Sequence, residues 1–446
     1  MKRSVKSLAL LLVLCLFVGG YVLAQHLNQD TAQVSQTEGS FALTEHTADE
    51  ISSLQYTRSE VDYHFIHAGG EEWQLADNAA FPLDADAVQT MADKLVSMKG
   101  VRKLTDGIVL SDYGLDTPAF TVTVNWSDGS STCYAMGNAT PFDDGYYLNL
   151  DGDGSTIYVI STSLTSIFSK TMNSLAVKET IPSADNVTRI VIGNVLDATW
   201  QETSTTIDPD QHWYDTASGA ALDDEKIDSL ITTANSLSFA SVSNASPTAE
   251  ELEEYHLTED AQTVITLYSG DEAQRMLRLG ADTGSSSYYA MLPDSGIVYT
   301  MSSTNVNTLL NTQVDDLVNR ALMPLDYAYL AQADFSGDGI AFTLVPQPSV
   351  EEEEAESDEE SASGSEDPGE AIWEQVQSLT LTDLYEMHEG TELLTIRADS
   401  VNGMSRTLTI STYDVDNYQV SVDGAAAGLV SADGVDKLIR TLKNMK

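Results

Sequence analysis

One spacing of apolar residues occurs three times in this sequence and limits its possible folds more than any single motif does. Five apolar residues stand at offsets of 0, 3, 4, 7 and 10 in each copy. Such offsets place five side chains on one helix face, which must be buried against another layer. The sequence therefore predicts three related modules. The copies are Val88, Met91, Ala92, Leu95 and Met98; Ile227, Leu230, Ile231, Ala234 and Leu237; and Val435, Leu438, Ile439, Leu442 and Met445.

The first two modules can be aligned well beyond this helix. Trp73 and Trp213 are 140 residues apart (213 − 73 = 140), and other pairs share about the same separation. A second apolar stripe, from Leu164 to Leu175, also recurs from Val306 to Leu317. One period of about 140 residues therefore covers both modules. The further matching pairs are Tyr113 and Tyr255, Gly137 and Gly280, Tyr146 and Tyr288, Tyr147 and Tyr289, Tyr158 and Tyr299, and Pro182 and Pro324.

Between the helical stripes, residues alternate with period two, as in half-buried strands. Alternating segments flank Gly69 and Gly70, Asp128 and Gly129, and the Asp-Gly run that begins at Asp151. Asp-Gly and Gly-Gly pairs favour tight hairpin turns, so these segments predict hairpins. The predicted class is α+β: tandem modules of antiparallel β-meander sheet with helices packed on one face, plus an N-terminal transmembrane helix.

We expect the third module to be incomplete. Its apolar stripe at Val435 is aligned with the first helix of the other modules, and the chain given ends at Lys446, so the meander and second helix should be absent. The expected divisions are an N-terminal anchor or signal segment (1–27), a polar stalk (28–48), module 1 (49–181), module 2 (182–323) and partial module 3 (324–446), with a disordered acidic insertion at 347–371.

The acidic insertion has no aromatic residue from Glu351 to Glu370 and carries 11 carboxylates without a cation. A segment of this composition cannot bury enough apolar surface to offset the entropy of ordering it. We interpret it as a solvated spacer inserted within the early strands of module 3. The alternative is an acidic interaction segment.

The charge balance excludes one class of partner. The formal net charge is −48, from 21 Lys plus Arg against 69 Asp plus Glu, so removing the 11 carboxylates of the insertion still leaves −37. Nucleic acids are bound through Lys and Arg contacts to phosphate, so we expect no nucleic-acid partner. Anionic lipid headgroups are disfavoured for the same reason.

The N-terminus predicts export. Lys2, Arg3 and Lys6 precede an apolar run from Leu8 to Ala24, and no Lys or Arg follows until Arg58. This asymmetry places the N-terminus in the cytoplasm and the bulk outside. We favour a retained single-pass anchor in the cell membrane; the alternative is a signal peptide cleaved after Ala24. Cys15 and Cys133 are the two cysteines, so the exported modules must be stable without an internal disulfide.

Residue patterns typical of catalysis are absent from the sequence: it has no HExxH, Cys-x-x-Cys, Walker, Gly-x-Ser-x-Gly or Ser-x-x-Lys motif. His64 and His67 are close in sequence, but their odd separation places them on opposite faces of a strand. We therefore expect no enzyme, and we assign no catalytic, cofactor-binding or metal-binding residue. A site gathered from distant residues remains the alternative.

Two weaker patterns have structural interpretations. The first is two Asp-rich segments that resemble calcium loops, although neither has the glutamate that an EF-hand needs at its twelfth position. We interpret both as turns, with weak calcium binding as the alternative; their residues are Asn149, Asp151, Asp153 and Gly154, and Asp334, Ser336, Asp338 and Gly339. The second is the tyrosine pairs, in which one ring should face the core and the other should cover the sheet or contact the next module, with a carbohydrate or peptide surface as the alternative. Trp73 and Trp213 are expected in cores or between modules.

The order of several motifs resembles a bacterial family, domain of unknown function 4340. The motifs are Trp73, Gln74 and Leu75, "YGLDTP" from Tyr113 to Pro118, the Asp128 and Gly129 hairpin, Gly137, and the pair Tyr146 and Tyr147. Module 2 departs from the pattern because "YHL" from Tyr255 to Leu257 lacks the glycine, so the turn at Gly114 need not be shared. The resemblance implies a membrane-anchored protein, often encoded beside gliding-motility-type ABC transporters, and it supplies no catalytic residues.

Two functional classes follow. The first is a non-enzymatic, membrane-anchored extracytoplasmic accessory or scaffold protein of the bacterial cell envelope, with a protein partner such as an ABC transporter permease. The second is an extracytoplasmic ligand-binding receptor or enzyme that acts on an envelope polymer. Whole-module repetition favours the first class, whereas deep polar pockets at equivalent places in modules 1 and 2 would favour the second.

Overall fold

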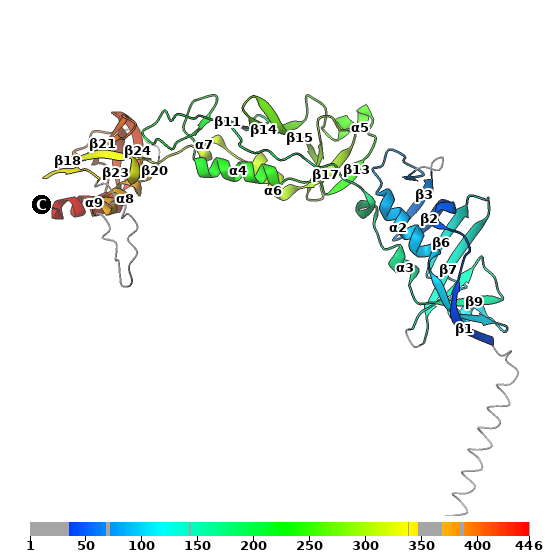
Figure 1. Cartoon of the computed structure of the whole chain (residues 1–446). Helices are drawn as coiled ribbons and strands as arrows, with labels where there is room; N and C mark the ends of the chain where they lie inside the picture. The colour runs from blue at the N-terminus through cyan, green and yellow to red at the C-terminus, as the bar shows by residue number, and fades with distance from the viewer. Residues whose placement is uncertain are drawn as a thin grey trace, which may run out of the picture. The chain divides into compact units, whose positions relative to one another are not determined.

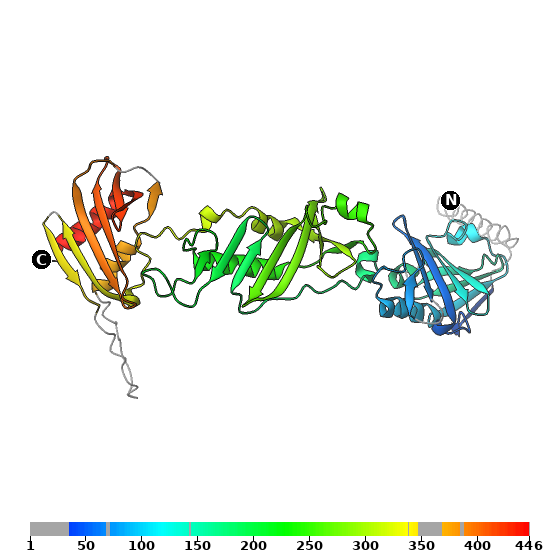
Figure 2. The same cartoon turned by 90° about the horizontal axis from the view of Figure 1, so that it is seen from above.

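Three antiparallel sheets with helices make up the fold, which is α+β (Figures 1 and 2). The structure is a computed structural model that describes residues 35–67, 72–141, 144–337, 339–346, 368–383 and 388–445. Within these residues, no helix is both long enough and apolar enough to cross a bilayer. The predicted anchor, 1–27, lies outside them.

The first sheet has the strand order β1-β5-β9-β8-β7-β6-β2-β3-β4. Helices α2 (Ala85–Val96) and α3 (Leu164–Ile167) contribute to the core on one face, and the 3-10 helices are η1 (Ala48–Glu50), η2 (Leu110–Tyr113) and η3 (Met172–Leu175). The strands are β1 (Ser35–Ala42), β2 (Ile51–Arg58), β3 (Val61–His67), β4 (Trp73–Leu75), β5 (Lys99–Thr105), β6 (Phe120–Trp126), β7 (Ser131–Ala139), β8 (Tyr146–Leu150) and β9 (Thr156–Ile160).

Two features of this sheet bear on the sequence predictions. The stripe is buried from Val88 to Met98, as predicted, although Met98 follows the end of α2. Asp84 caps the helix by accepting the Ala87 N–H. Strand β1, in contrast, occupies part of the expected polar stalk. It pairs with β5, where the absent side chain of Gly100 leaves room for the Phe41 ring opposite.

The second sheet repeats the topology of the first. Its order, β12-β11-β10-β14-β15-β16-β17-β13, corresponds strand for strand to β4-β3-β2-β6-β7-β8-β9-β5. Figure 2 shows its strands in front of α4. The elements are β10 (Arg189–Ile192), β11 (Leu196–Trp200), β12 (Trp213–Asp215), α4 (Asp224–Ser236), β13 (Ser241–Asn244), α5 (Ala249–Glu254), β14 (Thr263–Ser269), β15 (Glu272–Asp282), β16 (Ser287–Met291), β17 (Val298–Ser302), α6 (Ser303–Leu310) and α7 (Val314–Leu317).

One tight contact is identical in the two sheets and explains a pair of matched glycines. A Cβ added at Gly137 would lie 2.2 Å from the Tyr113 carbonyl oxygen, and one at Gly280 would lie 2.1 Å from the Tyr255 carbonyl oxygen. The preceding turn is also shared, because Gly114 has φ 68° and His256 has φ 55°. The expectation that this turn need not be shared was therefore wrong, since a histidine adopts the left-handed backbone there.

The third sheet shows that the last module was aligned incorrectly with the other two. Its order is β19-β18-β21-β22-β23-β24-β20, which matches that of the second sheet except that, within the described residues, the short strand equivalent to β12 is absent. The meander expected to be absent is present. The elements are β18 (Leu330–Gly337), β19 (Ile340–Leu344), α8 (Pro368–Gln377), β20 (Leu381–Asp383), β21 (Glu392–Ser400), β22 (Ser405–Thr412), β23 (Asn417–Val422), β24 (Ala425–Ser431) and α9 (Ala432–Asn444), with η4 (Tyr327–Tyr329) before them.

The helix that carries the Val435 stripe is α9, and it follows the last strand of its sheet as α6 follows β17. It is therefore the second helix of its module, and α8 is the first. Ile372, Trp373 and Val376 of α8 are buried, and residues 368–371 lie in α8 although they were assigned to the disordered insertion. The insertion otherwise falls on 347–367, outside the described residues, between β19 and α8.

Candidate functional site

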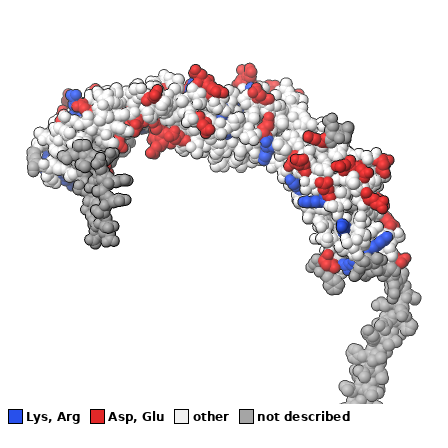
Figure 3. Space-filling view, in the orientation of Figure 1, with Lys and Arg blue, Asp and Glu red and all other residues white. Residues whose placement is uncertain are grey.

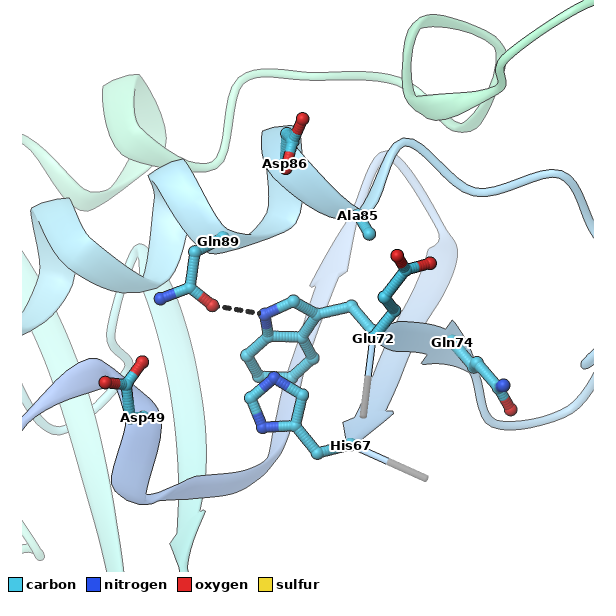
Figure 4. Close-up of a pocket in the computed structure, with 8 residues that line it drawn as sticks. Asp49, His67, Glu72, Gln74, Ala85, Asp86 and Gln89 are labelled. Atoms are coloured by element: carbon cyan, nitrogen blue, oxygen red, sulfur yellow. Dashed lines mark hydrogen bonds between the residues drawn. The ribbon is translucent and has the colours of Figure 1, made fainter. Parts of the chain in front are cut away.

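A groove of about 690 Å³ lies beside the first turn of α2 in the first module (Figure 4). Three parts of the chain build it: η1, the facing ends of β3 and β4, and the N-terminal half of α2. Its lining residues are Asp49, His67, Glu72, Trp73, Gln74, Ala85, Asp86 and Gln89.

Two aromatic rings form the inner wall of this groove. Trp73 is 4% exposed and belongs to the module core. Its indole Nε1 donates a hydrogen bond to Gln89 Oε1 at 2.7 Å, and the His67 ring lies against it with centroids 3.9 Å apart. His67 Nδ1 is 2.7 Å from the Ile51 carbonyl oxygen, which fixes Nδ1 as the donor in that bond. The wall is therefore rigid.

The rim of the groove is acidic. Asp49, Glu72 and Asp86 are exposed carboxylates, and the described lining residues include no Lys or Arg. Glu72 points toward Ala85 and the first turn of α2 in Figure 4. Figure 3 shows acidic side chains over all three modules, with basic side chains among them that are most visible on the first module. The groove suits a cationic or hydrogen-donating group and disfavours phosphate.

In module 2, side chains of the module itself fill the equivalent place. The loop between β11 and β12 has 12 residues (201–212), whereas the loop between β3 and β4 has five (68–72). The longer loop carries Gln211, whose side chain is 3% exposed. Asp224 stands where module 1 has Ala85 and accepts the His212 and Trp213 N–H groups. Burial raises the pKa of the Asp224 carboxyl, and those two N–H groups partly oppose the shift.

A second surface lies on the sheet face opposite α2. A shallow pocket of about 380 Å³ there is lined by Gln55, Tyr56, Thr57, Asp62, Tyr63, His64, Asp77, Thr121 and Thr123. His64 lines this pocket and His67 lines the groove. The prediction that the two histidines lie on opposite faces is confirmed, and they do not meet.

The tyrosine pairs divide between the two faces of each sheet. Tyr146 packs on the main core, whereas Tyr147 contacts Tyr113 with ring centroids 4.8 Å apart in a smaller cluster. In module 2, the Tyr288 hydroxyl donates to Asn307 Oδ1, and Tyr289 contacts Tyr255 at 4.4 Å. These contacts match the structural interpretation of the pairs.

The Asp-rich segments use their side chains within turns. Asp151 Oδ1 accepts the Cys133 N–H, and Asp153 Oδ1 accepts the N–H and hydroxyl of Ser155. Asp334 accepts the Thr343 hydroxyl at 2.7 Å, while Asp338 lies outside the described residues. Within the part of the chain that the structure describes, no group of three His, Cys, Asp or Glu side chains is arranged to hold a metal ion.

Sequence reasoning missed the groove itself. It interpreted His67 as an ordinary strand residue and Trp73 as a core or inter-module residue, and it did not consider Asp49, Glu72 or Asp86. Considered by itself, Asp86 is a favourable charge at a helix N-terminus and does not indicate a groove. The different lengths of the equivalent loops, five residues in module 1 and 12 in module 2, were the available signal.

Comparison with protein families agrees with the repeat. The model of Domain of unknown function (DUF4340) matches residues 73–217 and 213–417. The chain belongs to this family. The two matches begin at Trp73 and Trp213, the first residues of β4 and β12, so the DUF4340 unit begins at the same strand in both modules. No curated protein and no solved structure matches the chain.

Proposed function

We propose that this DUF4340 protein is a non-enzymatic, membrane-anchored extracytoplasmic accessory or scaffold protein. Its N-terminal segment holds it in the cell membrane, and its modules bind a protein partner such as the permease of an ABC transporter or another envelope complex. Export rests on the position of Lys2, Arg3 and Lys6 before the apolar run.

The observation that best supports this proposal is the repeated sheet with two unlike faces. In module 1, the helices and the large core cluster occupy one face, while polar side chains of β2, β3 and β6 line a shallow pocket on the other. A strand surface of this kind is suited to contact with another protein, because its polar groups keep the unbound module soluble.

The alternative is an extracytoplasmic ligand-binding receptor or an enzyme acting on an envelope polymer. The groove beside Trp73 favours binding of a ligand in module 1. Equivalent pockets in both modules would have favoured this class, but Gln211 and Asp224 fill the place in module 2. The scaffold proposal therefore has the better support.

The test is affinity capture from membranes with the anchor retained, after mild crosslinking. We expect a permease or another envelope protein to be enriched, and N-terminal sequencing of the captured protein to show that Met1 or Lys2 is still present. An exported variant without residues 1–27 is the control and should capture much less partner. Recovery of the chain alone in both cases would contradict the proposal, and a mature start at Gln25 would exclude the retained anchor.

A further inference from the structure

The loop between β11 and β12 of module 2 carries an apolar side chain into the core of module 3. Most of module 2 and all of module 3 belong to one compact unit. Ile207, from this loop, is 3% exposed and packs in the same cluster of buried residues as Leu325 of module 3. In the turn between β21 and β22, the Asn402 side-chain nitrogen Nδ2 donates to the Thr206 carbonyl oxygen at 3.2 Å. The 201–212 loop therefore contacts module 3 through both apolar and polar groups.

Hydrogen bonds inside module 2 hold this loop in a defined shape. Tyr214 of β12 is 2% exposed, and its hydroxyl accepts the Thr205 N–H at 2.9 Å and donates to the Gln211 carbonyl oxygen at 3.2 Å. The Asn319 side chain, after α7, donates to Gln211 Oε1 at 3.0 Å. Because the loop is fixed to module 2 in this way, a movement of module 3 relative to module 2 must break the contacts of the loop with module 3.

Four carboxylates meet beside the inserted isoleucine. Asp208 follows it in the loop, is half-buried, and accepts the Asp210 N–H on Oδ1 at 3.0 Å. Asp210 belongs to the same loop, Asp224 begins α4, and Asp326 precedes η4 of module 3. Tyr329 of η4 forms a hydrogen bond with the Asp210 carboxylate. Modules 2 and 3 thus bring like charges together where they touch, and these charges repel one another when they are ionised.

We propose that this contact is a pH-sensitive joint, which holds modules 2 and 3 as one rigid pair in acid and loosens as the pH rises. The buried Ile207 side chain supplies an attraction at every pH, because the hydrophobic effect does not depend on ionisation. The carboxylates add a repulsion that grows as they ionise. The joint therefore sets how strictly the spacing of the two modules is fixed. This inference goes beyond the proposed function and holds for a scaffold and for a receptor alike.

The direction of the pH dependence follows from Asp208. Burial is the main cause that raises the pKa of its carboxyl, and the carboxylates of Asp210, Asp224 and Asp326 raise it further, while the Asp210 N–H opposes the shift. Burial also raises the pKa of Asp224, although two backbone N–H groups and the His212 imidazole oppose that shift. A carboxyl with a raised pKa binds its proton more tightly in the docked state. Docking is therefore strongest below the usual value of about 3.9 and weakens as the pH rises through the docked pKa.

Pulsed electron paramagnetic resonance on the full chain tests the joint by measuring the distance between spin labels on the two modules. Ser229→Cys on α4 and Lys437→Cys on α9 provide exposed labelling sites, and Cys15→Ser and Cys133→Ser remove the native thiols. We expect one narrow distance distribution at about pH 4 and a broader distribution at about pH 8.

The Asp208→Asn variant separates charge from shape, because asparagine keeps Oδ1 as the acceptor for the Asp210 N–H. Its distance distribution should stay narrow at both pH values. The matched control is Asp294→Asn, which removes an exposed charge between β16 and β17 of module 2 and should broaden as the wild type does. A second label pair within module 3, Ala425→Cys with Lys437→Cys, should stay narrow at both pH values because the module remains folded.

Four results would overturn the inference. The first is an equally wide distribution for the wild type at both pH values, and the second is a full pH response in the Asp208→Asn variant. The third is a loss of the pH response in the Asp294→Asn control, which would assign the effect to surface charge in general. The fourth is broadening of the pair within module 3 at the higher pH, which would show that the module itself opens and not the joint.

Discussion

Single residues show most directly that the modules are copies of one fold. Gly137 and Gly280 each lie under a tyrosine carbonyl, and each carbonyl belongs to a segment that turns through a left-handed residue. A glycine is required because a side chain would take the space of that carbonyl. These positions could be matched from the sequence, but the reason for the match could not, since the contact joins residues far apart in the chain.

We expect Gly137→Ala and Gly280→Ala each to destabilise their own module by about 1 to 3 kcal/mol, because the new methyl group must displace backbone atoms. Gly154→Ala is the control, since a Cβ there meets nothing within 4 Å. Chemical denaturation of the three variants measures the effect. Equal stability of Gly137→Ala and Gly154→Ala would show that the close contact is not maintained in solution.

The ion pair on the second sheet gives a pH-dependent prediction. Arg189 donates two hydrogen bonds to Asp197, at 2.9 and 2.7 Å, and these bonds lower the pKa of the Asp197 carboxyl. A lowered pKa stabilises the fold above the unfolded value of about 3.9, and this contribution is lost as pH falls through the folded pKa.

Asp197→Asn should therefore cost about 0.5 to 1 kcal/mol at pH 7, a small value because both side chains are partly exposed and screened by solvent. The difference from the wild type should shrink as the pH is lowered below about 4. Denaturation curves at several pH values, with Asp294→Asn as an exposed control, measure it. A cost that stays constant down to pH 2 would mean that the ion pair is not its source.

At the scale of elements, the sequence predicted the hairpins and the first two helices well but misplaced the third module. The stripes at Val88 and Ile227 lie on α2 and α4, and the Asp128 and Gly129 turn joins β6 to β7. Helix α8 was missed because it is short and begins directly after an acidic run. The stripe of α9 fits either helix of a module, and only the strand order shows which helix it is.

With α8 as the first helix of the third module, the acidic segment should end where α8 begins, at Pro368. Deleting residues 351–366 should leave the unfolding midpoint in urea nearly unchanged, because the apolar residues of the segment are two small alanines, Ala355 and Ala362. Trp373→Ala in α8 should cost about 3 to 5 kcal/mol, since Trp373 is 0% exposed and donates to the Leu325 carbonyl. Large destabilisation by the deletion, or none by Trp373→Ala, would mean that α8 is not the first helix of this module.

At the scale of the whole molecule, the central claim is that the chain consists of copies of one sheet, each stabilised by its own core. The first and third sheets have separate clusters of buried residues, which include Leu95 in the first and Leu438 in the third. The third cluster also contains Ile207, from the loop between β11 and β12. The groove could not be predicted at this scale, because it depends on a loop difference between modules whose cores are alike.

Hydrogen exchange measured by mass spectrometry on the Leu95→Ala variant tests that claim most directly. Leu95 is fully buried against the first sheet, so its truncation should cost about 2 to 5 kcal/mol. We expect faster exchange in β2, β6 and β7 and unchanged exchange in β14, β15, β21 and β22, with Leu438→Ala affecting only the third sheet. Faster exchange in all three sheets after either substitution would contradict it.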